Sequence, residues 1–258
     1  RGLGDVYKRQ CAVREHAETR VFGNVGALTH TKARNPNQII AVCGCMAQQE
    51  HVAEKLKKSY RIVDLVFGPH ELWRFPELLR SVCTEHRRVF AIDPADGSVA
   101  EGIPQQRDGS VKAWLSIMYG CNNFCTYCII PYARGRCRSM PLDVLQQEVS
   151  QFAAEGYTEI VLCGINLAFY GKEWGGSLLD AVSLCCQTSG IQRVRLGSLE
   201  PERMTEDLLD ALAALPAFCP QFHLSLQSGC DHTLKEMHRR YTTQEYAALC
   251  AAIRSRFP

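Results

Sequence analysis

The alternation of strand-like and helix-like segments restricts the fold of this chain more than any other feature of its sequence. Short apolar runs typical of buried strands are separated by stretches where apolar residues recur every three or four positions. Strands that alternate with helices pair in parallel, so this order predicts an α/β fold. The expected strands span residues 38–43, 63–67, 88–92, 113–118, 158–163, 193–197 and 222–226. The expected helices span residues 12–29, 47–59, 70–82, 177–187, 205–214 and 243–256, with one more around the stripe Leu142, Leu145, Val149 and Phe152.

We expect two domains joined by a polar linker at residues 96–110, where Asp-Gly pairs and a proline favour turns. Residues 11–95 are predicted to form an N-terminal doubly wound parallel-sheet domain that is incomplete. Residues 111–258 are predicted to form a truncated partial (β/α) barrel, because four strands cannot close a barrel of eight. Residues 1–10 show no clear periodicity and resemble translated adapter sequence, so we interpret them as a non-native leader and the chain as a fragment cut at both ends.

The composition excludes several classes of protein. Hydrophobic residues make up 46% and charged residues 22% of the chain, which is typical of a globular protein and not of a disordered one. A net charge of +2 excludes a histone-like excess of positive charge. No apolar run approaches the roughly 18 residues that cross a bilayer, and no signal peptide begins the chain. We therefore expect a cytoplasmic protein with no membrane partner.

Cysteine is the unusual component, at 14 of 258 residues. Without a secretory signal, clustered cysteines indicate metal ligands or reduced core thiols. The sharpest cluster is Gly120-Cys121-Asn-Asn-Phe-Cys125-Thr-Tyr-Cys128, directly after a predicted strand. A zinc site takes four ligands, whereas three thiolates suit a 4Fe–4S cluster with one iron left for a small molecule. A zinc knuckle that borrows a distant histidine and plain core cysteines are the alternatives.

This spacing resembles the radical S-adenosylmethionine superfamily, and the longer run Tyr119–Arg136 resembles the tRNA methylthiotransferase family. Members of that family replace the C2 hydrogen of a modified adenosine beside the anticodon with a methylthio group. The resemblance implies that Cys121, Cys125 and Cys128 hold the catalytic cluster that cleaves S-adenosylmethionine, and that Tyr127 lies near the adenine of the cofactor. It also implies a tRNA substrate and an electron donor such as flavodoxin or ferredoxin.

Two N-terminal segments resemble the same family. Cys11-Ala-Val-Arg-Glu and Gly44-Cys45-Met-Ala-Gln48 match segments of its first domain, which holds an auxiliary 4Fe–4S cluster through three cysteines. The resemblance implies that Cys11 and Cys45 are ligands of this second cluster and that the third ligand belongs upstream. Cys43 is interpreted as a cysteine of a core strand.

Further matches follow the later strands. The resemblance implies that Gly164, Ser198, Glu200 and Gln227 bind the methionine and ribose parts of the cofactor, and ordinary turn chemistry is the alternative. Cys137 as a fourth cluster ligand would instead convert the site to electron transfer.

A basic loop follows the cysteine cluster. Arg134, Arg136 and Arg138 alternate along it, and Arg239-Arg240 forms a second basic pair. Contact with tRNA phosphates is the functional interpretation, and solvated side chains are the alternative.

The resemblance divides between two branches of the family. The segments Val21–Leu28, Cys43–His51 and Asp64–Gly68 resemble the isopentenyl-adenosine (MiaB-type) branch. The segments Gly164–Asn166, Leu196–Pro201 and Phe222–Thr242 resemble the threonylcarbamoyl-adenosine (MtaB-type) branch. We hypothesise a chimera joined near Cys121–Cys128. The alternative functions are a radical S-adenosylmethionine fragment without sulfur transfer, a ferredoxin-like electron carrier, and a zinc-stabilised RNA-binding module.

Overall fold

The computed structural model describes residues 6–9, 15–92 and 111–257. The chain divides into two compact units. The first unit comprises the residues before 104 together with the segment 128–135, and the second comprises residues 104–127 and 136–258. The predicted linker at 96–110 lies outside the described residues.

The first unit contains a four-stranded parallel sheet. Its strands are β1 (Val6–Arg9), β2 (Ile40–Cys43), β3 (Leu65–Phe67) and β4 (Val89–Ala91), hydrogen-bonded in that order. Its helices are α1 (Glu15–Ala27), α2 (Thr29–Arg34), α3 (Glu50–Ser59), the 3-10 helix η1 (Pro69–Arg74), α4 (Phe75–Glu85) and α5 (Ile130–Arg134).

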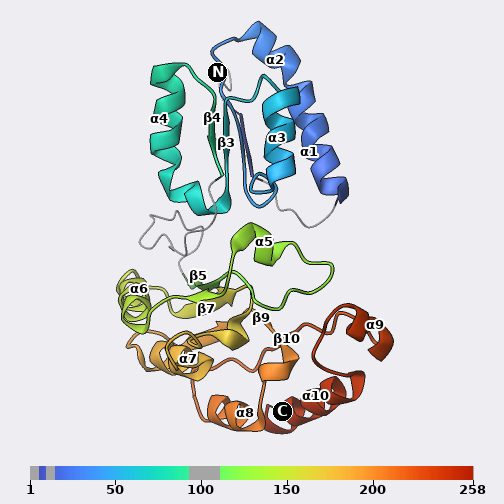
Figure 1. The fold of residues 1–258 in the computed structure, drawn as a ribbon. Helices are drawn as coiled ribbons and strands as arrows, with labels where there is room; N and C mark the ends of the chain where they lie inside the picture. The colour runs from blue at the N-terminus through green and yellow to red at the C-terminus, as the bar shows by residue number, and fades with distance from the viewer. Residues whose placement is uncertain (1–5, 10–14, 93–110, 258) are drawn as a thin grey trace. The chain divides into compact units, whose positions relative to one another are not determined.

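Helices cover both faces of this sheet, as the predicted doubly wound domain requires. Alternate side chains of a strand point to opposite faces. Accordingly, Val42 packs in one cluster with Leu56 of α3, whereas Cys43 packs in another with Leu78 of α4. Helices α1 and α3 lie on one side of the strands and α4 on the other (Figure 1). The doubly wound prediction is confirmed.

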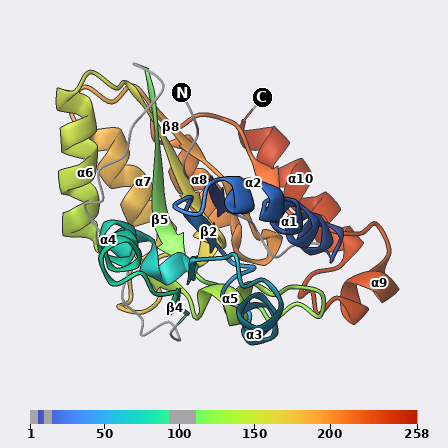
Figure 2. The same cartoon turned by 90° about the horizontal axis from the view of Figure 1, so that it is seen from above.

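The second unit contains a four-stranded sheet in the order β6-β5-β7-β8, formed by β6 (Arg138–Ser139), β5 (Lys112–Tyr119), β7 (Glu159–Gly164) and β8 (Arg193–Leu196). Only β6 is antiparallel. The strands β9 (Ser198–Leu199) and β10 (His223–Leu224) form a separate parallel pair. The helices are η2 (Leu167–Phe169), α6 (Leu142–Ala154), α7 (Leu178–Gln187), η3 (Pro201–Arg203), α8 (Glu206–Ala213), α9 (Asp231–Glu236) and α10 (Thr243–Arg256). Helices α6 and α7 lie side by side in both views (Figure 2).

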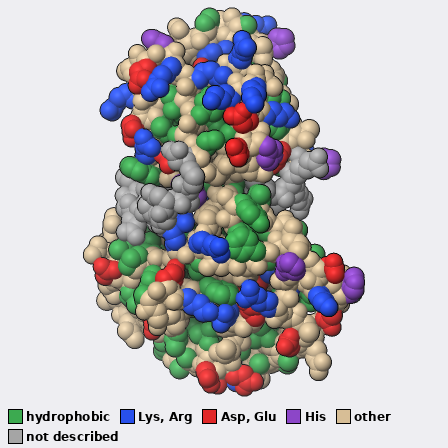
Figure 3. All heavy atoms as spheres, in the orientation of Figure 1, with side chains coloured by type: hydrophobic (Ala, Val, Ile, Leu, Met, Phe, Trp, Pro, Cys, Tyr) green, Lys and Arg blue, Asp and Glu red, His purple; other side chains and the backbone are tan. Residues whose placement is uncertain are grey.

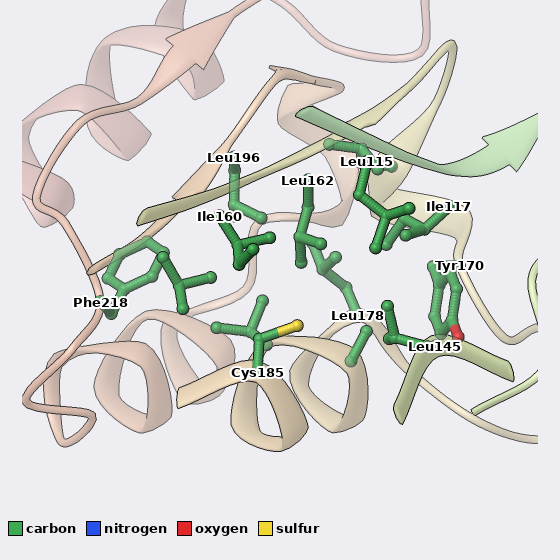
Figure 4. Close-up of a cluster of buried hydrophobic side chains, with 14 of the residues drawn as sticks. Leu115, Ile117, Leu145, Ile160, Leu162, Tyr170, Leu178, Cys185, Leu196 and Phe218 are labelled. Atoms are coloured by element: carbon green, nitrogen blue, oxygen red, sulfur yellow. The ribbon is translucent and has the colours of Figure 1, made fainter. Parts of the chain in front are cut away.

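The core of the second unit lies between this sheet and its helices. Figure 4 shows Ile160, Leu162 and Leu196 extending from the strands toward Leu178 and Cys185 of α7. All five are buried. Parallel strands with helices on the covered face make an open, curled sheet, so the predicted partial (β/α) barrel is confirmed.

The expected strands and helices are all present, with ends that shift by a few residues. The helix expected at 70–82 divides into η1 and α4, because Pro76 in the first turn of α4 has no backbone N–H to continue the helical hydrogen bonds. The sequence analysis assigns no element to residues 1–10, yet Val6–Arg9 forms β1 by pairing with β2. It also misses the short elements α2, α5, β6, β9 and α9, whose lengths of two to six residues carry too little periodicity. In the described ranges, no helix has the length and apolar character needed to cross a membrane.

Replacing Leu162 by Ala is expected to destabilise the second unit by about 2–5 kcal/mol, because Leu162 is fully buried in the centre of the sheet and its removal leaves a cavity. The measurement is the free energy of unfolding in denaturant. Val111→Ala is the matched control. Because Val111 is 60% exposed, this substitution is expected to change the free energy of unfolding by no more than about 0.5 kcal/mol. Equal losses for both variants would contradict this description of the core.

Candidate functional site

The three clustered cysteines lie on the loop between β5 and α5. Gly120 adopts a φ of 67° at the start of this loop, a conformation that glycine accepts readily. Cys121 and Cys125 are buried at 8% and 9% exposure, and Cys128 is half-buried. None of the cysteines in the described ranges is in a disulfide. The loop therefore carries reduced thiols on a backbone free of regular secondary structure.

Two polar groups lie beside Cys121, one from the loop after β7 and one from its own loop. The Asn166 amide Nδ2 lies 3.8 Å from the Cys121 Sγ, and the backbone N–H of Asn123 lies 3.5 Å from it. Asn166 is 1% exposed, and its Oδ1 has no hydrogen-bond partner among the described residues. Burial, together with the nearby Cys121, raises the pKa of Cys137 to about 11. The site around Cys121 is thus a shielded region with donors directed at sulfur.

A buried arginine joins two of the predicted cofactor residues. The Arg239 guanidinium donates to Tyr127 Oη at 2.5 Å and to Glu200 Oε2 at 2.7 Å. The side chains of Arg239 and Glu200 are only 6% and 13% exposed. Burial by itself lowers the pKa of Arg239, but the bonds to Tyr127 and Glu200 raise it above its usual range. Tyr127 remains half exposed.

The other predicted cofactor residues follow the later strands. Ser198 Oγ lies 3.1 Å from His223 Nδ1, which connects β9 to β10. Gln227 has a φ of 61°, and Tyr241 Oη donates to the carbonyl of Leu226 at 2.8 Å beside it. The loop after β10 is therefore held in an unusual backbone conformation by a buried phenol.

Gly164 ends β7 and has a packing role. A Cβ there would lie 2.8 Å from Leu167 Cδ2 and 2.9 Å from Met118 Cβ, both buried. Only glycine fits without displacing these neighbours.

The parallel strands bring these residues to one edge of the second unit. The cysteine loop follows β5, Gly164 ends β7, Ser198 and Glu200 follow β8, and Gln227 follows β10. The carboxyl ends of barrel strands are where barrel enzymes place their active sites.

The cysteine loop offers the type of ligand that an iron–sulfur cluster needs, because such clusters are held by cysteine thiolates. Within residues 6–9, 15–92 and 111–257, no three side chains of His, Cys, Asp or Glu lie close enough to share one metal ion. Cys128 groups with the first unit, and Cys121 and Cys125 with the second. The assignment of these three cysteines as ligands stays a prediction.

The predicted auxiliary site is described at only one of its cysteines. Cys45 follows β2 and is 1% exposed, and Arg134 Nε lies 3.1 Å from its Sγ. Cys11 lies outside the described residues. Cys43 packs in the core against α4, as the sequence analysis expects.

The basic residues occupy different environments. Arg136 is exposed over the Phe124 ring at 4.8 Å, and Arg138 is half-buried. Basic side chains lie beside exposed apolar ones on the face of the second unit seen in Figure 3. The expectation that Arg239 contacts phosphate is wrong for this structure, because its guanidinium is buried against Glu200.

Asn166 and Tyr241 also belong to this region, although the sequence pattern does not single them out. Asn166 lies in the Gly164–Asn166 run and Tyr241 directly after the basic pair. Both were within segments noted for family resemblance, which was the only available signal for them.

Comparisons with known proteins cover nearly the whole chain. A family model described as "Radical SAM superfamily" matches residues 115–258, and one described as "Uncharacterized protein family UPF0004" matches residues 6–68. The chain is 42% identical over 250 residues to the tRNA-2-methylthio-N(6)-dimethylallyladenosine synthase of Acetivibrio thermocellus, and 45% identical over 251 residues to that of Alkaliphilus oremlandii. Each alignment covers 96% of this chain and 52% or 53% of the relative, so the chain spans about half their length.

Solved structures show a similar fold at low sequence identity. The radical S-adenosylmethionine methyltransferase TsrM from Kitasatospora setae, with cobalamin and a [4Fe-4S] cluster bound, matches with a TM-score of 0.64 at 16% identity. That match covers 98% of this chain and 56% of TsrM. The cobalamin-dependent S-adenosylmethionine radical enzyme OxsB gives a TM-score of 0.64 at 11% identity, covering 98% of this chain and 39% of OxsB.

Replacing Gly164 by Ala is expected to destabilise the second unit by about 1–3 kcal/mol, because the added methyl group overlaps Leu167 and Met118. Gly229→Ala is the control, since a Cβ at that position meets no atom within 4 Å. Thermal or denaturant unfolding measures both. A Gly164→Ala variant as stable as Gly229→Ala would show that Gly164 is not required for packing.

Alkylation at about pH 8 is expected to modify Cys230 well before Cys137, because thiolate is the reactive form. Hydrogen bonds from Thr233 and His232 lower the pKa of exposed Cys230, whereas burial raises that of Cys137 to about 11. Treatment with limiting iodoacetamide followed by peptide mass spectrometry measures the alkylation rate of each cysteine. Raising the pH should reduce the difference between the two rates. In denaturant the two rates should converge; equal rates in the folded protein would contradict these assignments.

Proposed function

The chain belongs to the radical S-adenosylmethionine superfamily, and from that premise we propose that it is part of a tRNA methylthiotransferase. The proposed reaction adds a methylthio group to C2 of N6-isopentenyladenosine beside the anticodon. One observation carries the proposal: 42–45% identity to tRNA-2-methylthio-N(6)-dimethylallyladenosine synthases extends over 250 residues, across both units.

The proposed cofactors are a 4Fe–4S cluster on the cysteine loop, S-adenosylmethionine, and a second cluster in the first unit. Cys121, Cys125 and Cys128 would hold the first cluster, and Cys11 and Cys45 would contribute to the second. A reduced cluster supplies the electron for reductive cleavage of S-adenosylmethionine. The [4Fe-4S] cluster bound to TsrM supports the cluster proposal by fold alone.

The chain's own residues would bind and orient the cofactor. The buried amide of Asn166 lies beside Cys121, so it can orient a sulfur ligand there. Tyr127 presents a half-exposed aromatic ring next to the Arg239–Glu200 pair, which suits an adenine above it and a ribose hydroxyl at the carboxylate. Low exposure of Cys121 and Cys125 would limit the access of water to this region.

The proposed macromolecular partners are tRNA and a small electron donor of the flavodoxin or ferredoxin type. Exposed Arg136, stacked on Phe124, is the basic residue of the loop best placed to meet a phosphate. Arg134 is engaged by Cys45 and Arg138 is half-buried, so their contact with tRNA is the weaker part of this proposal.

N6-Threonylcarbamoyladenosine is the second candidate substrate. It rests on the segments after Cys128 that resemble the threonylcarbamoyl-adenosine branch of the family. Incubating the reconstituted chain with tRNA carrying one or the other modification, followed by nucleoside mass spectrometry, distinguishes the two. Formation of deoxyadenosine without methylthio product from either tRNA would support a fragment that cleaves S-adenosylmethionine only.

Cys125→Ala is expected to abolish deoxyadenosine formation, because a cluster with two protein thiolates is not held in this loop. The measurement is chromatography of the products after anaerobic reconstitution with iron and sulfide, S-adenosylmethionine and a reductant. Cys83→Ala is the matched control, since Cys83 is an exposed thiol on α4 of the first unit. Deoxyadenosine from the Cys125→Ala variant at the control's rate would refute the ligand assignment.

A further inference from the structure

One short segment of the second unit contacts three of the loops that the sequence analysis assigns to the cofactor. This segment, Glu236–Tyr241, begins at the last residue of α9 and is called the clamp segment. We propose that Arg239 in the clamp segment is a positioning residue that holds the cysteine loop and the loop after β9 in the arrangement that receives S-adenosylmethionine. This inference rests on the proposed function and assigns a new role to a residue whose basic pair in the sequence predicts a phosphate contact.

The end of α9 fixes the direction of the clamp segment. The backbone N–H of His238 donates to the Lys235 carbonyl at 3.0 Å, and that of Arg239 donates to the Leu234 carbonyl at 2.9 Å. These two bonds form a Schellman motif. His238 occupies its left-handed position with a φ of 57°, which glycine would adopt more easily. The motif turns the chain so that Arg239 points back into the unit.

Arg239 then bridges two separate loops. One end of its guanidinium donates to Glu200 after β9, and the other donates to Tyr127 in the cysteine loop. The guanidinium carbon also lies 5.8 Å from the centre of the Tyr127 ring. A single buried cation therefore fixes the distance between an aromatic side chain and a carboxylate that flank the predicted cofactor site.

The two ends of the clamp segment make further contacts with the same region. Thr126 Oγ1, beside Tyr127, donates to the Glu236 carbonyl at 2.9 Å. Tyr241 Oη donates to the Leu226 carbonyl, next to Gln227 with its left-handed backbone. The segment thus touches the loops after β5, β9 and β10, and Arg239 is its only charged side chain with bonds to two of them among the described contacts.

The chemistry of arginine suits this position. Its planar fork donates in two directions from two nitrogens in a fixed geometry, whereas a lysine ammonium has all its donors on one nitrogen at the end of a flexible stem. Loss of Arg239 would also leave Glu200 buried without its counter-ion. Removing this side chain should therefore loosen both loops together.

Amide hydrogen exchange on the full chain, without cofactors, tests the proposal directly. Arg239→Gln and Arg239→Lys are both expected to speed exchange about tenfold at residues 120–127 and 198–200, because charged hydrogen bonds are lost. Exchange in α6 and α7 should stay unchanged. Lys235→Ala is the matched control: it removes an exposed positive charge from the same helix and should leave all these rates as they are.

Affinity for S-adenosylmethionine, measured by calorimetry on the reconstituted protein, gives the second readout and should fall about tenfold or more in both Arg239 variants. An Arg239→Lys variant that matches the unsubstituted protein in both readouts would overturn the proposal, as would faster exchange spread evenly through the unit. Faster amide exchange in these loops without a loss of affinity for S-adenosylmethionine would also overturn the proposal. If the unsubstituted protein itself binds no S-adenosylmethionine, the proposed function fails, while the exchange rates still decide whether Arg239 holds the loops.

Discussion

Packing of one face of β5, β7 and β8 against α6 and α7 organises the second unit. Side chains alternate across a strand, so Leu115, Ile160 and Leu196 reach the helices while their neighbours face away. Because these strands are parallel, their carboxyl ends lie at one edge of the sheet. The loops that leave this edge carry the cysteines and the predicted cofactor residues. The chemistry of the site therefore depends on burial of apolar surface that takes no part in it.

A buried ion pair connects the loops at the carboxyl edge of the second unit's strands. The Arg239–Glu200 pair is nearly excluded from water, and such a pair is retained only when each partner is well bonded. Here Arg239 also donates to Tyr127, while its buried Nε has no partner among the described residues, and Tyr241 donates to the backbone of the neighbouring loop. These polar contacts connect the loops that follow β5, β9 and β10.

The cysteines separate into distinct chemical groups. Cys43 and Cys185 are packing residues whose thiols lie among aliphatic side chains, and burial raises the pKa of Cys185 to about 12. Cys121 instead lies under an amide donor, and Cys45 under an arginine. Spacing alone distinguishes these groups in the sequence, and the structure adds the polar neighbours of Cys121 and Cys45.

The sequence by itself determined the α/β alternation, the central positions of the longer helices and strands, and the short spacing of the cysteine loop. Each of these depends on residues within a few positions of one another, through helical or strand periodicity. Only the tertiary structure decided the contacts of Arg134 and Arg239, which the sequence grouped with Arg136 as basic residues. Their partners, Cys45 and Glu200, lie 89 and 39 residues away, so that folding alone brings each pair into contact.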